Sequence, residues 1–440
     1  MRLVLASLLL AGVAVGPASA DPALQEAIAR DYSTSLAPLW DYFHRNPELS
    51  TLEVKTAARL AQELRALGIP VTEKVGGTGI VGVIRNGNGP TVLIRADMDG
   101  LPVEEKSGLP NASRLRQTDI DGVEKPVMHA CGHDTHITAL VGTARQLLAH
   151  KDKWQGTVVL IGQPAEERVR GASAMLKDGL YTRFPKPDYA LAFHVDSSLP
   201  AGVIRVPEGT AYSSSDNFSI IVHGVGAHGA SPHRGKDPVL LASEIVVALQ
   251  QLVSREKSPL EAGVVTVGSI HGGTKNNIIP DQVELLLTVR SNNEAVRAQL
   301  LDGIRRIAQN MGRVAGLPED KLPEVHPPEE STPVTSNDPE TARRVKAALV
   351  AGLGADAVTE KPRDNMGAED FAYLSAPETG VKGVYFQIGG TPPEDFAREK
   401  AGGAPVPSHH SPLFKIAPEP TIKTGVAAMV LAVYDLMPGR

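Results

Sequence analysis

The chain has 440 residues and a formal net charge of −6, and 42% of its residues are hydrophobic. This length exceeds one typical hydrophobic core and predicts two domains. The acidic balance, the aromatic content of 4% and a sequence without a basic run exclude the charge pattern of a nucleic-acid-binding protein.

The N-terminal residues 1–20, MRLVLASLLLAGVAVGPASA, have the layout of a secretory signal peptide. Arg2 supplies the basic start, an apolar run extends from Leu3 to Val15, and small residues lead to a cleavage site after Ala20. The alternative is a membrane anchor, but the apolar run is shorter than the roughly 20 residues that span a bilayer. We therefore predict a periplasmic or secreted protein.

Residues 21–206 are predicted to form the first part of a catalytic domain. The spacing of apolar residues indicates helices up to about residue 66, with a break at Pro47. The apolar runs GIVGVIRNG, TVLIRAD, GTVVLIGQ and DYALAFH that follow are typical of buried strands. Because strands alternate with helices, we expect an α/β fold with a mostly parallel sheet flanked by helices.

Residues 207–325 have a different pattern. The strand-like segments NFSIIVHGVGAH, GVVTVGSIHGG and QVELLLTVRS lie among two helical stretches, 237–256 and 293–316. This order fits a smaller α+β lid or dimerisation domain inserted into the first. Residues 326–440 then complete the catalytic domain.

Side chains that can bind metals follow several predicted strands, where a parallel sheet places its active site. They are Asp97 and Asp99, Glu166 and Glu167, His194, and His409 and His410 on a late loop. The only cysteine, Cys131 in HACGHDTH, could be a buried core residue, a nucleophile or a metal ligand. A nucleophile would leave the glutamate pair and the distant histidines without a role, whereas a metal site uses them all.

Nine motifs occur in the order HRNPELS, RADMDGLPVEE, MHACGHDTH, PAEE, AFHV, GAHGASPHRGKDP, GGTKNNIIPD, MGAEDFAYL and HHSP. In this order they resemble a family of dinuclear metallo-amidohydrolases that includes aminoacylases, hippurate hydrolases, auxin-amino-acid conjugate hydrolases and related carboxypeptidases. The resemblance is to the branch with ACGHD and covers nearly all of the chain after the signal peptide. It implies a catalytic domain that holds two divalent metal ions and a lid domain that dimerises.

The resemblance also implies roles for individual residues. It makes Glu166 the general base and Asp99 the residue that orients a ligand, and it leaves Asp97 unassigned because other branches keep a metal-binding histidine there. The implied metal ligands are Cys131 as the bridging thiolate, His133, Glu167, His194 and His410. His409 competes with His410 for the last position, which the spacing to HSP assigns to His410.

Substrate contacts are implied mainly in the lid. His228 would stabilise the oxyanion in the neighbouring subunit's active site, with His233 as a second candidate. Asn277, favoured over Asn276, and Arg290 would bind the substrate carboxylate. Gly389 is implied to contact the same carboxylate. Residues 114–126, RLRQTDIDGVEKP, resemble an insertion before the metal motif that could rearrange the mouth of the site.

We therefore expect an exported metal-dependent amidohydrolase that cleaves N-acyl or N-aroyl amino acids. We expect a homodimer or higher homo-oligomer, with neither nucleic acid nor membrane as a partner. A thiolate ligand favours zinc, although such mixed ligands also suit manganese, cobalt or nickel. The alternatives are a dipeptidase or carboxypeptidase of the same mechanism, a cysteine hydrolase, and a metal-binding protein without activity, which would not need Glu166.

Overall fold

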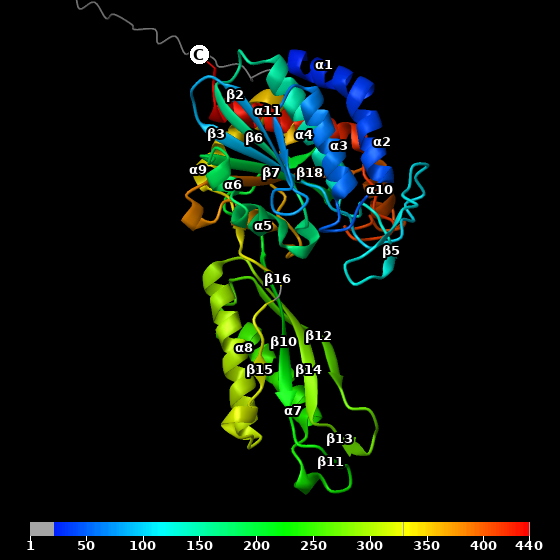
Figure 1. Ribbon diagram of the computed structural model, residues 1–440, viewed down its shortest axis with the longest axis vertical. Helices are drawn as coiled ribbons and strands as arrows, with labels where there is room; N and C mark the ends of the chain where they lie inside the picture. Colours follow the sequence, from blue (N-terminus) through cyan, green and yellow to red (C-terminus); the bar gives the residue numbers. More distant parts are fainter. Residues whose placement is uncertain (1–21, 329, 440) are drawn as a thin grey trace, which may run out of the picture.

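The computed structural model describes residues 22–328 and 330–439, so the predicted signal peptide lies outside the described residues. A large α/β domain is joined through a narrow waist to an elongated smaller domain (Figure 1). The smaller domain is formed by an internal segment of the chain, and we call it the lid domain. These features confirm the predicted fold class.

The large domain is built on a seven-stranded sheet with the order β1-β2-β6-β3-β7-β18-β8. Its four central strands, β6, β3, β7 and β18, pair in parallel, and the outer strands pair antiparallel. The strands are β1 (Val71–Glu73), β2 (Ile80–Asn86), β3 (Thr91–Asp97), β6 (Gly156–Gln163), β7 (Tyr189–Pro200), β8 (Ile204–Arg205) and β18 (Lys382–Thr391).

Helices cover both faces of this sheet because its strands are apolar on both sides. Successive side chains of a strand point to opposite faces, so Ile94 of β3 joins one core cluster and Leu93 joins another. The first cluster packs under α1 (Pro22–Asp31), α2 (Ala37–Arg45), α3 (Val54–Ala66), α4 (His133–Ala149), α9 (Pro339–Leu353) and α11 (Pro418–Leu436). The second packs under α5 (Gly171–Lys177), α6 (Leu180–Arg183) and the turn Asp370–Tyr373.

The lid domain has a five-stranded antiparallel sheet in which β10 and β14 are central. Its elements are β10 (Ser214–His223), α7 (Pro238–Gln251), β12 (Gly263–Gly272), β14 (Gln282–Ser291), α8 (Glu294–Val314), β15 (Glu324–Val325) and β16 (Glu330–Thr332). Side chains of α7 and α8, such as Ile245 and Leu300, pack on Leu285 of β14. β16 belongs to this sheet although it lies beyond the predicted end of the lid segment at residue 325.

Shorter strands complete the structure: β4 (Arg116–Thr118), β5 (Glu124–Pro126), β9 (Thr210–Tyr212), β11 (Ala227–His228), β13 (Ile278–Ile279) and β17 (Thr335–Ser336). A further helix, α10 (Pro393–Lys400), precedes the HHSP loop. In the described part of the chain, one helical stretch, Pro238–Glu256, has the length and composition of a membrane span. Its apolar residues Leu241, Ile245 and Leu249 are buried in the core of the lid domain.

Candidate metal centre

The predicted ligands meet at one edge of the large sheet, where the parallel strands end. Glu166 and Glu167 follow β6, His194 lies in β7, and α4 begins at His133. A cavity of about 790 Å³ opens at this edge, and its lining includes Cys131, both glutamates and residues of the lid domain. This is the place at which open α/β sheets bind ligands.

Two groups of possible ligand atoms share the sulfur of Cys131. One group joins Cys131 with His133 and His194, and the other joins it with Glu167 and His410; within each group the atoms lie within 4.8 Å of one another. Cys131 Sγ lies 3.4 Å from His194 Nε2, and His410 Nε2 lies 3.4 Å from Glu167 Oε2. A thiolate common to two groups is the arrangement needed to bridge two cations.

The structure also separates the two adjacent histidines of the HHSP loop. His409 Nε2 accepts a hydrogen bond from the backbone N–H of Ser197, and its Nδ1 lies 3.8 Å from Cys131 Sγ. His410 adopts a left-handed backbone conformation with φ of 65°, and this turns its ring towards Glu167. The geometry therefore favours His410 as the ligand and gives His409 a contact with the sulfur.

Two buried atoms of the cluster, His133 Nε2 and Glu167 Oε1, have no hydrogen-bond partner among the described residues. Burial raises the pKa of the Cys131 thiol well above its usual value, and Glu167 and Glu166 raise it further. Burial also raises the pKa of Glu167 to about 7. Unpaired ligand atoms and buried acids that resist ionisation are groups that a bound cation stabilises, so these residues fit two divalent ions.

Asp99 holds two of these ligands in place. His133 Nδ1 donates to the backbone oxygen of Asp99 at 2.8 Å, which leaves Nε2 facing the cluster. The Asp99 carboxylate accepts hydrogen bonds from the backbone N–H of Glu167 at 3.0 Å and from Ser50 Oγ at 2.6 Å. These contacts fit the orienting role that the resemblance implies for Asp99.

Asp97 lies 3.7 Å from His133 Nε2, but both of its oxygens accept hydrogen bonds from protein donors. Arg95 Nη1 donates to one oxygen at 2.6 Å, and His136 Nδ1 donates to the other at 2.5 Å. His136 Nε2 in turn accepts from the backbone N–H of Val195, next to the ligand His194. Asp97 therefore supports the cluster through His136, and this agrees with the prediction, which did not make Asp97 a ligand.

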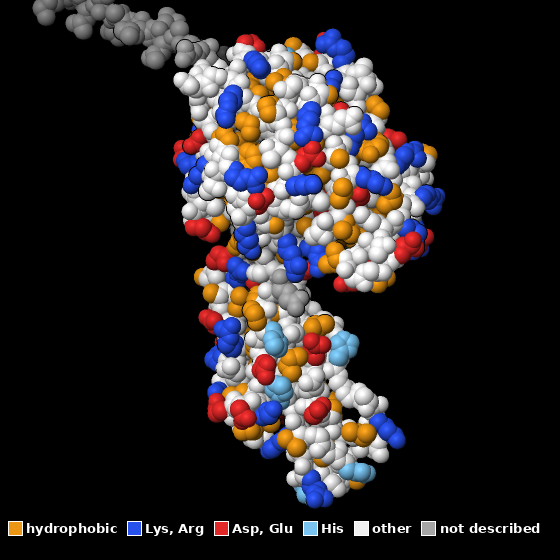
Figure 2. Space-filling model, in the orientation of Figure 1, with side chains coloured by type: hydrophobic (Ala, Val, Ile, Leu, Met, Phe, Trp, Pro, Cys, Tyr) orange, Lys and Arg blue, Asp and Glu red, His pale blue; other side chains and the backbone are white. Residues whose placement is uncertain are grey.

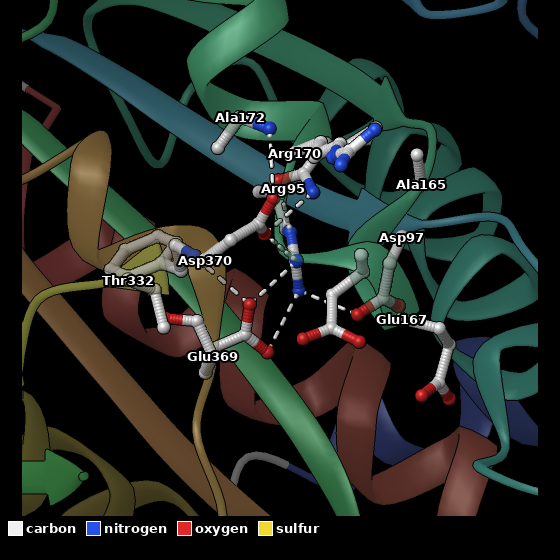
Figure 3. Close-up of polar contacts among 12 residues, drawn as sticks. Arg95, Asp97, Ala165, Glu167, Arg170, Ala172, Thr332, Glu369 and Asp370 are labelled. Atoms are coloured by element: carbon white, nitrogen blue, oxygen red, sulfur yellow. Dashed lines mark hydrogen bonds and ion pairs between the residues drawn. The ribbon is translucent and has the colours of Figure 1, made fainter. Parts of the chain in front are cut away.

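Arg95 is fully buried and also binds the acidic pair of the MGAEDF motif (Figure 3). Its Nη2 donates to Glu369 Oε1 at 2.7 Å and to Asp370 Oδ1 at 3.1 Å. Glu166 lies against the same two acids, with carboxylate oxygens of all three within 4.8 Å of one another. Four residues of this network have no role predicted from the sequence, although each lies within one of the nine motifs: Arg95, His136, Glu369 and Asp370.

The remaining predicted residues lie in different places. Arg290 of β14 lines the cavity. His228, His233 and Asn277 are exposed in the segment of the lid domain that carries β11 and β13, and in Figure 1 these strands lie at the tip farthest from the large domain. Gly389 does not line the cavity: its N–H donates to Val203, and its oxygen accepts from Gly202 and Thr421.

Residues 114–126 contain the hairpin of β4 and β5 beside the N-terminal part of the large domain. Gln117 in this hairpin accepts a hydrogen bond from the backbone N–H of Leu49 and donates to Leu52. None of these residues lines the cavity.

The two-domain α/β fold thus places the predicted general base, Glu166, beside a cluster of possible metal ligands in one cavity, as a metal-dependent hydrolase requires. Residues 93–416 match the peptidase family M20/M25/M40. The chain is 38% identical over 394 residues to thermostable carboxypeptidase 2 of Saccharolobus solfataricus, covering 88% of this chain and 92% of the relative. It is 35% identical over 335 residues to the hippurate hydrolase of Campylobacter jejuni, covering 75% and 82%.

Among solved structures, the YXEP protein of Bacillus subtilis, a dinuclear metal binding peptidase of the M20 family, superposes with a TM-score of 0.72. It is 28% identical, and the match covers 94% of this chain and 98% of that one. The chain thus belongs to peptidase family M20, and it is an amidohydrolase of that family.

Proposed function

We propose that this protein is an exported enzyme that hydrolyses the amide bond of N-acyl or N-aroyl amino acids, which releases a carboxylic acid and a free amino acid. The observation that carries the proposal is Glu166, buried beside the predicted ligand Glu167 in a cavity whose wall also contains Arg290, a cation without an ion pair among the described residues. The similarity to a hippurate hydrolase supports this substrate class.

Glu166 has the position and environment of a general base. When bound, two divalent ions would activate the attacking water and polarise the amide carbonyl. Glu166 accepts a proton from the water as its oxygen bonds to the carbonyl carbon, and delivers it to the nitrogen when the C–N bond breaks. Burial, Glu369 and Glu167 raise the pKa of Glu166 well above its usual value, which suits a carboxylate that must hold this proton between the two steps.

Arg290 is suited to bind the carboxylate of the amino-acid half. Its side chain has neither a hydrogen bond nor an ion pair with the described residues, and burial lowers its pKa. A free acid next to the scissile amide would pair with this guanidinium. This contact would make the enzyme prefer amino-acid conjugates, which have a free carboxylate next to the amide, over internal peptide bonds.

His228 supports the proposal of a homodimer or higher homo-oligomer. The tip of the lid domain, which carries β11 and β13, lies at the end of the molecule away from the large domain (Figure 1), and none of its residues lines the cavity. An oxyanion contact from His228, or from His233 as the second candidate, would therefore come from a second copy, together with Asn277. We propose two partners for this chain: a second copy of itself and the small N-acyl amino acid.

The test is hydrolysis of hippurate, N-acetyl-methionine and an indole-acetyl amino acid beside simple dipeptides. We expect activity to disappear with a chelator and to return with zinc, manganese, cobalt or nickel; the metal that restores most activity identifies the preferred ion. Activity unchanged by chelation would refute the metal mechanism. Faster cleavage of dipeptides would instead favour a dipeptidase or carboxypeptidase, an alternative that the similarity to a carboxypeptidase supports.

Glu166→Gln tests the general base directly. The variant keeps the size of the side chain but cannot take the proton, so kcat should fall by about 10²–10⁴-fold while the bound metal is retained. Metal content and kcat measured on the same sample separate a catalytic role from a ligand role. A variant with normal kcat would remove Glu166 from the mechanism. Export is tested by mass spectrometry of the mature N-terminus, which should begin at Asp21.

A further inference from the structure

A second cation, Arg363, lines the cavity near the connection between the domains. Its Nη1 donates to the backbone oxygens of Ala211 at 2.9 Å and Gly367 at 3.4 Å. Its Nη2 donates to Ser213 Oγ at 2.9 Å and Asn292 Oδ1 at 3.1 Å. These acceptors are all uncharged, so they fix the guanidinium in place without neutralising it.

Arg363, which is half-buried, differs in this respect from the buried Arg205 of the cavity wall. Arg205 donates to the carboxylate of Asp196, and the two form an ion pair. Arg363 has no ion pair with the described residues, and its Nε–H group has no acceptor among them. Burial lowers the pKa of Arg363, and the charges of Tyr212 and Asp196 only partly offset this effect.

Lys361 adds a second charge beside Arg363. It lines the same cavity and donates to the backbone oxygen of Ser198 at 2.9 Å, again without an ion pair among the described residues. An ammonium group has three donors, so two remain for a ligand. Figure 2 shows Lys and Arg side chains around the junction of the two domains.

The neighbours of Arg363 connect it with the segment of Arg290 and with the predicted metal ligands. Asn292, which accepts a hydrogen bond from Arg363, follows Arg290 by two residues in the chain. The Arg363 guanidinium also lies 5.4 Å from the ring centre of Tyr212, whose ring packs against His194. Arg363 therefore has one neighbour close in sequence to the predicted carboxylate contact and another in contact with a predicted metal ligand.

The acidic residues of the cavity wall form no ion pair with Arg363 or Lys361 among the described residues, and Asp196, which raises the pKa of Arg363, is paired with Arg205. Asp364 is exposed and accepts a hydrogen bond from Asn365, and Glu399 of α10 accepts one from the backbone N–H of Val406. Glu330 pairs with Arg168. The two free cations thus mark one part of the wall, next to Arg290, as suited to an anion.

We propose that Arg363 and Lys361 form a second carboxylate-binding subsite, which selects N-acyl derivatives of acidic amino acids, with the side-chain carboxylate at this pair and the α-carboxylate at Arg290. The proposal rests on the proposed amidohydrolase function. Arg363 offers its free Nε–H group and a guanidinium already held in place, and Lys361 offers its two remaining N–H groups. A preorganised cation binds an anion with little loss of conformational freedom.

The experiment compares kcat/KM for N-acetyl-glutamate and N-acetyl-glutamine, which differ at the side-chain terminus and have nearly the same size. We expect the wild-type enzyme to prefer glutamate about tenfold, the effect of a charge-assisted hydrogen bond at a partly exposed site. Lys361→Met and Arg363→Met should each reduce this ratio by several-fold. Because the ratio is taken within one protein, a general loss of folded or active enzyme cancels.

Two controls place the effect at this subsite. Lys186→Met removes an exposed lysine outside the cavity lining and should leave the ratio unchanged. Comparison of N-succinyl-methionine with N-butyryl-methionine tests whether the carboxylate belongs instead to the acyl half. A wild-type enzyme that cleaves both acetyl substrates equally well, or variants with an unaltered ratio, would overturn the subsite. A preference confined to the succinyl substrate would overturn its placement.

Failure of the proposed function gives a different result. If no N-acyl amino acid is cleaved with any of the metals, the proposed substrate class is refuted, and the acidic subsite with it. If hippurate or N-acetyl-glutamine is cleaved but glutamate is not preferred, the function stands and only the acidic subsite is refuted.

Discussion

The protonation of His44 provides a quantitative test of the structure outside the metal cluster. His44 of α2 is buried between two acids: its Nδ1 lies 2.8 Å from Asp134 Oδ2, and its Nε2 lies 3.3 Å from Glu105 Oε1. Burial alone lowers the pKa of His44, but the hydrogen bonds and charges of Asp134 and Glu105 outweigh it and raise the pKa to about 10. The imidazolium joins α2 to the first turn of α4.

The size of the effect follows from the shift. An unfolded histidine titrates near 6.5, and each pKa unit corresponds to about 1.4 kcal/mol, so the charged His44 stabilises the folded state by roughly 4–5 kcal/mol. Because the folded pKa is raised, this stabilisation is fully present below about pH 6.5. It decreases as the pH rises and is lost once the pH passes through about 10.

The assay is urea unfolding of the wild type and His44→Gln at about pH 6 and about pH 10. The difference in the free energy of unfolding between the two proteins should be several kcal/mol larger at the lower pH. His150→Gln is the matched control, because the His150 ring bonds to the backbone oxygen of Gln146 and to no acidic group among the described residues. If the His44→Gln difference is the same at both pH values, His44 is not charged between these acids and the reasoning fails.

Two further predictions concern the metal centre. Arg95→Met leaves the buried Asp97 and Glu369 without their counter-charge and should lower the free energy of unfolding by about 3–5 kcal/mol in urea; a loss below about 1 kcal/mol would show that the network contributes little. Cys131→Ser removes the atom common to both ligand groups, so metal analysis should find less than half of the wild-type metal with unchanged thermal unfolding of the apoprotein. Wild-type metal content would contradict a bridging thiolate.

The sequence predicts the sheet and the edge at which the site forms, because both depend on local pattern. Strands buried on both faces are continuous apolar runs, as in TVLIRAD and GTVVLIGQ, and polar side chains after them must meet at one edge of a parallel sheet. The roles of Cys131, Glu166 and Glu167 came from the resemblance, which the family match confirms for the chain as a whole.

The parts that sequence reasoning missed depend on contacts between distant segments. Arg95 binds Glu369 and Asp370, which lie more than two hundred residues further along the chain. The sequence does not show which of its many charged residues will be buried together. The substrate role of Gly389 was implied by a motif, whereas its backbone groups are occupied by Val203, Gly202 and Thr421. Hydrogen-bond occupancy of this kind becomes visible only when the chain is folded.

Under the proposed function, the distribution of charge across the cavity would orient a substrate. On the inner side, Cys131, Glu166 and Glu167 lie over the acids of the Arg95 network, and this side attracts cations. On the outer side, Arg290 and Arg363 have no ion pair with the described residues, and this side attracts anions. With the two divalent ions that the proposed function requires, the inner side would attract the carbonyl oxygen, and Arg290 would attract the carboxylate of the amino-acid half. Under that proposal the wall sets the direction of the scissile amide, because the carboxylate reaches Arg290 only when the carbonyl faces the ligand residues.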